Sequence, residues 1–288
     1  MAILITGVSG FIGKYLAKEL LKSNYKVYGI YRRNKPYISD KKFILIKADL
    51  TKKFLIPNEV HSIFHLAADS PENSSENKLI SNNIKSTKNL ILSIKNKKIK
   101  NFYFFSSIAV YERFKKKNIL LKEQLKYLNP NSNYGKSKYI SEKLILKMIS
   151  KKTNILIFRL PAVVAKNSFL SSFYKIKKKI IQNQKITIIN PNQKFNGIIH
   201  IKDFTKIVFD IFKKKNLIKK YKIINIASKK PEKFKDTIIY MYGLLKKKKN
   251  FDIKNYKYIN LISIKRLKKI RTKIPTVKQS VYKFVKNR

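Results

Sequence analysis

Residues 2–13 read AILITGVSGFIG, an apolar run that leads directly into three glycines. The chain contains only seven Gly, so three of them at intervals of three residues are unlikely to reflect composition alone. An apolar strand, a glycine turn and a helix in this order are typical of a dinucleotide-binding fold. Gly7 allows a sharp turn, Gly10 lets the backbone approach a pyrophosphate, and Gly13 lets the helix pack closely on the sheet.

The helix that follows this turn is the second half of the predicted phosphate site. It is predicted over residues 14–22, and Phe11, Ile12 and Gly13 lead into it. The first backbone N–H groups of a helix point outward without intrahelical partners, and they favour an anion. We therefore predict that Gly7, Gly10, Phe11, Ile12 and Gly13 contact a cofactor through its phosphates.

Short apolar runs alternate with helical patterns along most of the chain. The runs predict strands, and continuous apolar strands separated by helices are typical of a parallel sheet covered on both faces. The predicted strands are 2–6, 26–31, 42–48, 62–68, 101–107, 154–160 and 222–227, and the predicted helices are 14–22, 78–96, 134–150, 203–214 and 232–245. The predicted fold class is α/β, a Rossmann-type doubly wound parallel sheet with a smaller C-terminal substrate-binding cap. The regular alternation of strands and helices weakens after Leu160. We therefore assign residues 1–160 and 200–228 to the Rossmann domain, and 161–199 and 229–288 to the cap.

Several classes of protein are disfavoured by composition. With no Cys and three scattered His, the chain offers neither thiolate chemistry nor a His-rich metal cluster, and we predict no metal site. Met1 leads almost at once into the first apolar run, and no apolar stretch reaches about 18 residues. We expect a cytoplasmic protein that has no membrane partner.

The formal net charge of +52 admits two interpretations. One is a basic surface that binds nucleic acid or another polyanion. The other is compositional drift, which the 60 Lys against seven Arg and their spread along the whole chain favour. We expect no specific nucleic-acid partner.

Six further segments strengthen the interpretation of the glycine turn, and they read KADL (47–50), HLAA (65–68), NIKSTKNL (83–90), FFSSIAVY (104–111), YGKSK (134–138) and HIKDF (200–204). With these segments and the Gly-x-x-Gly-x-x-Gly spacing, the sequence resembles the extended short-chain dehydrogenase/reductase family of nucleotide-sugar epimerases, dehydratases and reductases. The resemblance covers nearly the whole chain. It implies cofactor contacts, beyond the glycine turn, at Asp49, Leu50, Leu66, Ala67, Ala68 and Asn83.

The same resemblance identifies a candidate catalytic set. Eight Tyr residues are followed by Lys four positions later, but only Tyr134 and Lys138 lie in the family's YGKSK context. A phenol with a pKa of about 10 is a poor base at neutral pH, and a nearby Lys ammonium lowers that pKa. The resemblance implies that Tyr134 transfers a proton, that Lys138 also contacts the cofactor with Tyr134, and that Ser107 hydrogen-bonds the substrate oxygen.

Two arginines bear on the choice of cofactor. NAD enzymes usually carry Asp or Glu after the second strand, whereas here Arg32 and Arg33 follow it. A guanidinium suits a 2′-phosphate, so the sequence favours NADP, with NAD as the alternative.

The predicted function is that of an NAD(P)-dependent oxidoreductase acting on a nucleotide-linked sugar. Ile108 and Ala109 stand where the family's 4,6-dehydratases carry Asp-Glu, which argues against that reaction. Because reductases exchange their cofactor and often use NADPH, a 4-keto-sugar reductase is the first prediction and a 4-epimerase the alternative. An alternative of another class is a nucleotide-sensing or nucleic-acid-binding protein on the same fold. A homodimer is compatible with the resemblance.

Overall fold

A computed structural model describes residues 1–71, 75–114, 119–214, 222–255, 260–270 and 272–286. The chain forms two compact units. The first comprises Met1–Glu112, Leu128–Arg159 and Val208–Ile224, and the second comprises Arg113–Tyr127, Leu160–Ile207 and Asn225–Arg288. Relative to the boundaries predicted from the sequence, residues 113–127, 160, 200–207 and 225–228 fall in the second unit.

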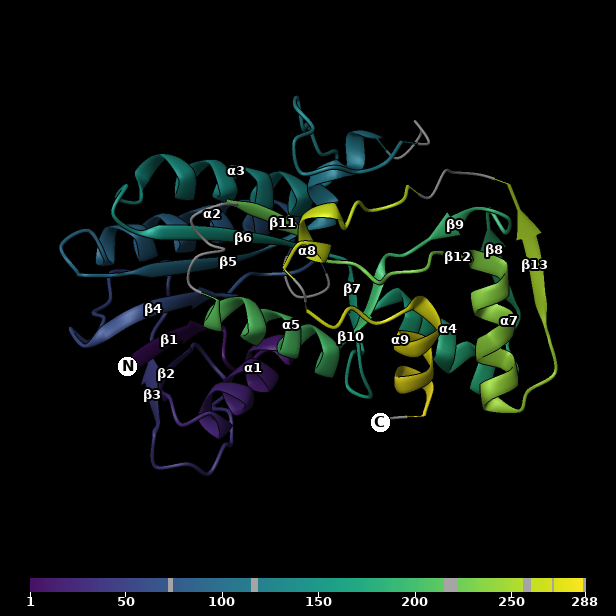
Figure 1. The fold of residues 1–288 in the computed structure, drawn as a ribbon, viewed down its shortest axis with the longest axis horizontal. Coiled ribbons are helices and arrows are strands. Elements are labelled where there is room, and N and C mark those ends of the chain that lie inside the picture. The colour runs from purple at the N-terminus through teal and green to yellow at the C-terminus, as the bar shows by residue number, and fades with distance from the viewer. Residues whose placement is uncertain (72–74, 115–118, 215–221, 256–259, 271, 287–288) are drawn as a thin grey trace. The chain divides into compact units, whose positions relative to one another are not determined.

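The first unit is built on a seven-stranded sheet (Figure 1). Its strand order is β11-β6-β5-β4-β1-β2-β3, and the pairings from β3 through β5 are parallel. The strands are β1 (Ala2–Thr6), β2 (Lys26–Tyr31), β3 (Phe43–Lys47), β4 (Val60–His65), β5 (Asn101–Ser107), β6 (Asn154–Leu160) and β11 (Ile223–Asn225). From β1 the chain runs outward to β3 and then returns to β4 on the other side of β1. The strand order therefore reverses beside the glycine turn, where open α/β sheets bind ligands.

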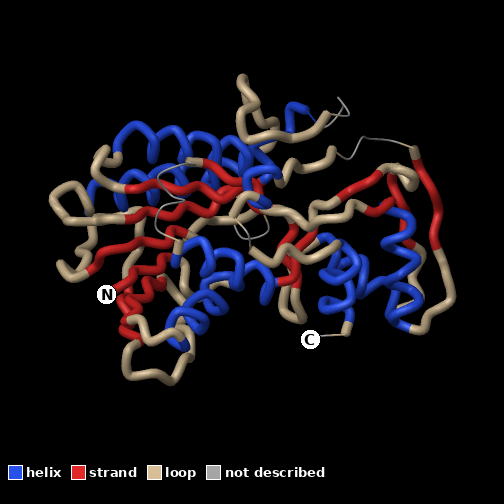
Figure 2. Tube along the Cα trace, in the orientation of Figure 1, coloured by secondary structure: helices blue, strands red, loops and turns tan. Residues whose placement is uncertain are grey.

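Helices cover both faces of this sheet (Figures 1 and 2). They are α1 (Phe11–Lys22), α2 (Glu76–Ser93), α3 (Asn133–Met148) and α5 (Ile201–Lys213). Alternate residues of each strand point to opposite faces, and both sets are apolar. Phe102 and Phe104 of β5 join the core with Leu90 of α2 and Ile145 of α3.

The opposite face is packed largely by aromatic rings. Phe64 of β4 and Tyr103 of β5 stack with ring centroids 4.5 Å apart, and Phe212 of α5 meets both rings edge-on at 5.5 and 5.9 Å. Such rings bury large apolar areas, which stabilises a sheet covered on both sides. The predicted α/β Rossmann-type fold is confirmed.

Three predicted strands run too far: 42–48 is β3 (Phe43–Lys47), 222–227 is β11 (Ile223–Asn225), and in 62–68 the strand ends early. The run 62–68 was expected to be extended throughout, but β4 ends at His65. Leu66 N–H still bonds Thr6 O at 3.3 Å, and Ala67 N–H is taken by the Thr6 side chain at 3.2 Å. The segment after His65 therefore turns across the end of β1 instead of extending the ladder.

The second unit has short strands in three pairs. These are β7 (Ala162–Val164) with β10 (Ile198–His200), β9 (Lys194–Phe195) with β12 (Glu232–Lys233), and β8 (Ile186–Ile189) with β13 (Phe251–Lys254). Its helices are α4 (Ser172–Ile181), α7 (Phe234–Leu245), α8 (Lys265–Lys268) and α9 (Val277–Val285), while a 3₁₀ helix, η1 (Ile108–Phe114), follows β5. Within this unit the buried Lys177 ammonium bonds the carbonyls of Phe284 and Val285, which caps α9. Across the part of the chain that is described, no helix is long and apolar enough to cross a membrane.

Gly13 provides a test of the packing of α1 on β1. A Cβ at this position would lie 2.4 Å from Gly7 O and 2.9 Å from Val8 Cα, both backbone atoms. We expect Gly13→Ala to lower the free energy of unfolding by about 1–3 kcal/mol, because α1 must shift away from the turn. Urea denaturation measures the change.

The matched control is Gly243, in the last turn of α7. A Cβ there meets nothing within 4 Å, so Gly243→Ala should stabilise the protein by about 0.5–1 kcal/mol through helix propensity. Equal effects of the two substitutions would contradict the packing assigned to Gly13.

Candidate active site

The turn after β1 is shaped by two close backbone approaches. Gly7 has φ +70°, a conformation that favours glycine, and a Cβ on it would lie 2.8 Å from the backbone of Ala67. A Cβ on Gly10 would lie 3.1 Å from Gly7 O, a tight contact, but would meet no other atom within 4 Å, so the turn is otherwise open on this side. Gly10 is also the N-cap of α1, whose first turn has no acidic residue. The helix start is therefore a favourable place for an anion.

A pocket of about 490 Å³ lies at this turn. Its walls come from the carboxyl ends of several strands and from α2. The lining residues predicted from the sequence are Gly7, Gly10, Arg32, Arg33, Asp49, Leu50, Leu66, Ala67, Ala68 and Asn83. These separate segments thus meet at one cavity, as expected at the reversal point of a doubly wound sheet.

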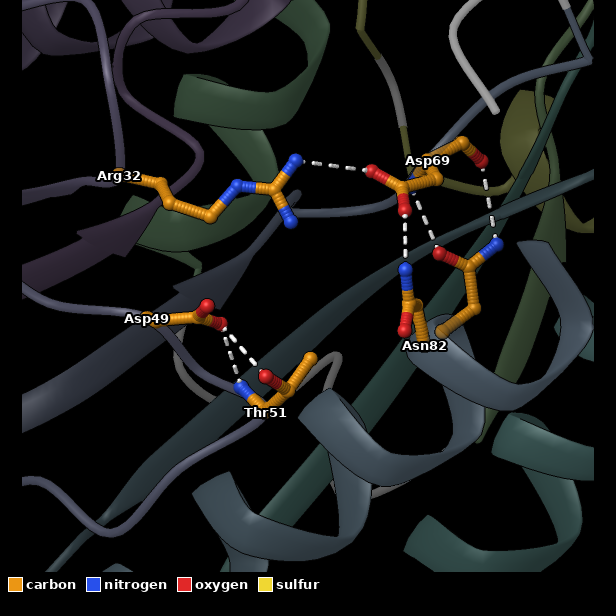
Figure 3. Close-up of polar contacts among 6 residues, drawn as sticks. Arg32, Asp49, Thr51, Asp69 and Asn82 are labelled. Atoms are coloured by element: carbon orange, nitrogen blue, oxygen red, sulfur yellow. Dashed lines mark hydrogen bonds and ion pairs between the residues drawn. The ribbon is translucent and has the colours of Figure 1, made fainter. Parts of the chain in front are cut away.

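Four charged residues line this pocket, Arg32, Arg33, Asp49 and Asp69, and Figure 3 shows all but Arg33. Arg32 Nη2 lies 3.4 Å from Asp69 Oδ1, while the other carboxylate oxygen of Asp69 accepts from Asn82 at 2.9 Å. Asp49 Oδ1 accepts from the Thr51 backbone N–H and hydroxyl at 2.9 and 2.8 Å. Burial opposes ionisation of Asp49, but the Thr51 hydrogen bonds and the nearby charges of Arg32 and Lys52 hold its pKa below the usual value.

Asn83 connects the pocket to α3. Its Oδ1 accepts from Asp69 N–H at 2.6 Å, and its Nδ2 lies 3.1 Å from both Asp69 O and Ser137 Oγ. Ser137 in turn donates to Tyr134 O at 2.8 Å. The predicted cofactor residue Asn83 is therefore also a buried fixing point between the pocket loop and the turn of α3 that carries Tyr134.

The three candidate catalytic residues come from β5 and α3. Ser107 ends β5, and its Oγ accepts from Ala109 N–H at 3.1 Å. Tyr134 lies in the first turn of α3, and Lys138 Nζ lies 5.8 Å from the centroid of the Tyr134 ring. Lys138 Nζ also donates to Phe105 O at 2.9 Å. This bond ties α3 to β5 two residues before Ser107.

Lys138 is buried, and burial disfavours the charged form of its side chain. Only 3% of the residue is exposed. Burial lowers the pKa of Lys138 to about 8, although the negative charge of Glu142 opposes the shift. Its amine therefore titrates much closer to neutral pH than an ordinary Lys does.

A buried ion pair lies one helical turn beyond Lys138. Arg159 binds Glu142 through two bonds, Nε–Oε1 at 3.0 Å and Nη2–Oε2 at 2.6 Å. Glu142 also accepts from Ser106 Oγ at 2.6 Å, and Arg159 donates to the Tyr111 hydroxyl at 2.7 Å. The pair thus fixes the end of β5 from both sides of Ser107.

His65 completes the buried polar layer under the site. Its ring nitrogens lie 2.7 Å from Thr6 Oγ1 and 3.1 Å from Thr87 Oγ1. Burial, with a smaller contribution from the Lys138 charge, lowers the pKa of His65 to about 3, so the ring is neutral at physiological pH. Among the described residues no group of three His, Cys, Asp or Glu is arranged to hold a metal ion.

Six predicted residues are not among those that line the pocket. Phe11, Ile12 and Gly13 form the first turn of α1, and Ser107, Tyr134 and Lys138 lie on β5 and α3. The lining residues that the sequence analysis missed are Ser9, Ile30, Tyr31, Asn34, Ala48, Asp69, Asn82 and Ser86. Asp69 had a visible signal, because it follows HLAA at the same sheet edge.

Comparison with known proteins identifies the family. The model of the NAD dependent epimerase/dehydratase family matches residues 3–227. The chain belongs to this family. The resemblance noted from the sequence motifs is confirmed, and it places the chain among NAD-dependent nucleotide-sugar enzymes.

Individual relatives agree with this assignment. The uncharacterized UDP-glucose epimerase YtcB of Bacillus subtilis is 30% identical over 245 residues, which cover 76% of this chain and 74% of that protein. UDP-glucose 4-epimerase of Pasteurella multocida is 31% identical over 53% of this chain, and the match spans about half of that enzyme, 49%. UDP-glucuronic acid 4-epimerase of Bacillus cereus, solved in complex with NAD, has the same fold, with a TM-score of 0.82 at 22% identity over 100% of this chain and 96% of that one.

The shifted pKa of Lys138 predicts a pH-dependent cost to stability. The folded pKa of about 8 lies below the ordinary 10.5, so the unfolded chain binds more protons between these values. Stability should rise with pH through this window. Lys138→Met removes the effect. We expect its stability advantage over the wild type to fall by about 2–3 kcal/mol between pH 7.5 and pH 10 in urea denaturation.

The exposed Lys143 on the same helix is the control. Lys143→Met should show the same difference from the wild type at both pH values. A Lys138→Met advantage that does not change with pH would mean that folding does not lower the pKa of Lys138, because the amine would then carry its proton equally in the folded and unfolded chains.

The Glu142–Arg159 pair predicts a large loss of stability on single substitution. Glu142→Gln leaves the Arg159 guanidinium buried without its carboxylate, and breaking such a pair costs about 3–5 kcal/mol. The double variant Glu142→Gln/Arg159→Met removes both charges and should recover more than half of that loss. Thermal and urea unfolding of the single and double variants measure the coupling.

An exposed ion pair serves as the control here. Lys185 and Asp252 lie 2.9 Å apart, with side chains that are 62% and 50% exposed. Asp252→Asn should cost less than about 1 kcal/mol. A Glu142→Gln effect of the same size would show that the buried pair is dispensable.

Proposed function

We propose that this protein is a nucleotide-sugar 4-epimerase that uses a nicotinamide dinucleotide. One observation carries the proposal. Lys138 donates to Phe105 O, and this bond holds it against the end of β5, where Ser107 lies. This places a Tyr–Lys helix turn and a serine at the same edge of the sheet as the phosphate-binding turn. Relatives named as UDP-glucose epimerases support the substrate class.

The residues of the pocket fit such a dinucleotide. The open side of Gly10, the start of α1 and the pocket of about 490 Å³ form a cradle for the diphosphate. Arg32, Asp49 and Leu50 would hold the adenosine half at the ends of β2 and β3. When bound, the nicotinamide supplies a hydride acceptor and donor.

In this proposal, side chains of the protein transfer the proton that accompanies the hydride. Tyr134 removes the proton from the sugar hydroxyl as the carbonyl forms, and returns it when the carbonyl is reduced. The Lys138 ammonium, 5.8 Å from the ring centroid, favours the phenolate form of Tyr134. The Ser107 hydroxyl would stabilise the substrate oxygen by a hydrogen bond.

A 4-keto-sugar reductase that uses NADPH is the second candidate. Arg32 and Arg33 both line the pocket, and guanidinium groups suit a 2′-phosphate. In a reductase the hydride would pass only toward the sugar, and the oxidised cofactor would leave. NADP therefore accompanies the reductase, whereas NAD, which is bound in the related solved structures, accompanies the epimerase.

Two assays separate the candidates. Purified protein is incubated with UDP-glucose, UDP-galactose or UDP-glucuronic acid and NAD, and the sugars are resolved by chromatography. An epimerase gives a product of unchanged mass with no net change in cofactor. A reductase instead consumes NADPH with a 4-keto sugar and gives a product two mass units heavier. No turnover in either assay would contradict both candidates.

Tyr134→Phe tests the catalytic assignment. The substitution removes the proton-transfer group and keeps the ring, so dinucleotide binding should persist while turnover falls at least about a hundredfold. The control is Tyr139→Phe, because Tyr139 forms a similar Tyr–Lys pair with Lys143, 4.5 Å away, on the same helix. Near-normal turnover by Tyr134→Phe would refute the role of Tyr134.

Other sequence-based expectations stay predictions. They are a cytoplasmic location, a homodimer and the absence of a specific nucleic-acid partner. The alternative of a nucleic-acid-binding protein predicts submicromolar, sequence-selective oligonucleotide binding that survives about 200 mM salt, whereas generic Lys-driven binding would collapse.

A further inference from the structure

We propose that Asp69 restrains Arg32 across the pocket, and thereby sets how strongly the pocket prefers a dinucleotide with or without a 2′-phosphate. The inference rests on the proposed function, because it requires that the pocket bind a nicotinamide dinucleotide. It assigns a specificity-determining role to a residue that lies on neither the glycine turn nor the Ser–Tyr–Lys set.

Asp69 is held in place from several directions. Its backbone N–H and O are both bonded to the Asn83 amide, at 2.6 and 3.1 Å, and its Oδ2 accepts from Asn82 at 2.9 Å. The side chain is only 13% exposed. The carboxylate is therefore a fixed negative charge on the pocket wall, since its loop and one of its oxygens are already bonded.

Arg32 is the more exposed partner of this contact. Its side chain is 39% exposed, and it extends from the end of β2 toward the free edge of the Asp69 carboxylate (Figure 3). The Nη2–Oδ1 distance of 3.4 Å describes a single contact instead of a two-bond fork. Ion pairs as exposed as this one are weak. A ligand that offers Arg32 a better anion can therefore break the contact.

The two dinucleotides differ in how they meet this arrangement. A 2′-phosphate needs Arg32, so NADPH must draw the guanidinium away from Asp69 and must also tolerate a second carboxylate, Asp49, whose pKa is lowered in part by the Arg32 charge. A 2′-hydroxyl makes no such demand. Asp69 therefore reduces the advantage that Arg32 would give to NADPH, and has little effect on NADH.

Asp69→Asn tests this role by direct binding of NADH and NADPH in calorimetry at constant ionic strength. Asparagine keeps the shape and can still accept from Asn82, but its amide no longer attracts a guanidinium. We expect NADPH to bind about two- to fivefold tighter than to the wild type, with NADH changed less than 1.5-fold. Asp40→Asn removes the same charge from an exposed position outside the pocket lining, and should change neither affinity.

A double-mutant cycle with Arg32→Met separates restraint of Arg32 from simple repulsion of the phosphate. In the Arg32→Met background, Asp69→Asn should change NADPH affinity less than 1.5-fold. An equal gain in both backgrounds would overturn the proposal, because Asp69 would then act on the phosphate without Arg32. Weaker binding of both dinucleotides to Asp69→Asn would overturn it as well, since Asp69 would then serve to hold the loop.

The outcomes also distinguish this inference from the proposed function. A wild-type protein that binds neither dinucleotide would refute the proposed function together with the role of Asp69. A wild-type protein that binds them, with an NADPH-to-NADH affinity ratio unchanged by Asp69→Asn, would refute the role of Asp69 alone.

Discussion

The close approach of Gly7 to the backbone of Ala67 is the constraint on which the site depends. A Cβ at Gly7 would lie 2.8 Å from Ala67 N and Cα, so the turn after β1 and the segment after β4 can meet only through glycine. Their meeting ends β4 at His65 and directs the following residues across the pocket. Asp69 reaches Arg32, and Asn83 reaches α3, because the segment after β4 is held at that point. The absence of a Cβ at Gly7 therefore allows the phosphate-binding turn and the opposite wall of the pocket to take these positions.

Below the pocket, the site is held together by polar groups that a merely stable core would not contain. Lys138, Glu142 and Arg159 are all nearly fully buried, and burial alone disfavours each charge. The ion pair compensates two of them, and the Phe105 carbonyl partly compensates the third. Hydrophobic replacements of such pairs are often as stable or more so. If Tyr134 transfers the proton as proposed, the Lys138 ammonium beside its ring has a role that stability alone does not explain.

The sequence predicts those parts of the molecule that local patterns determine. The glycine turn, the long apolar strands and α3 require only neighbouring residues, and β1, β2, β5 and β6 have the predicted ends. The pairs β7–β10, β8–β13 and β9–β12 were not predicted, since strands of two to four residues exist only through pairing with distant segments. The partnership of Arg159 with Glu142 was missed for the same reason, although an Arg inside the run NILIFRL indicates a buried partner. The contact of Arg32 with Asp69 spans 37 residues and follows from the course of the segment after β4.

The distribution of the few acidic residues bears on the meaning of the net charge. The chain has 15 Asp and Glu against 67 Lys and Arg, yet several of the acids occupy inward positions that make defined bonds. Glu142 binds Arg159, Glu123 accepts from Asn225 N–H, and Asp203 bonds Lys283 within the second unit. A surface selected to bind polyanions needs a local concentration of cations, and not merely a shortage of acids. Compositional drift toward Lys at exposed positions would instead leave acidic residues only where they form defined bonds, with Lys spread over the rest of the chain. At the pocket, by contrast, acidic residues lie next to a cation. Asp69 and Asp49 are close enough to Arg32 to limit which anions its charge can bind.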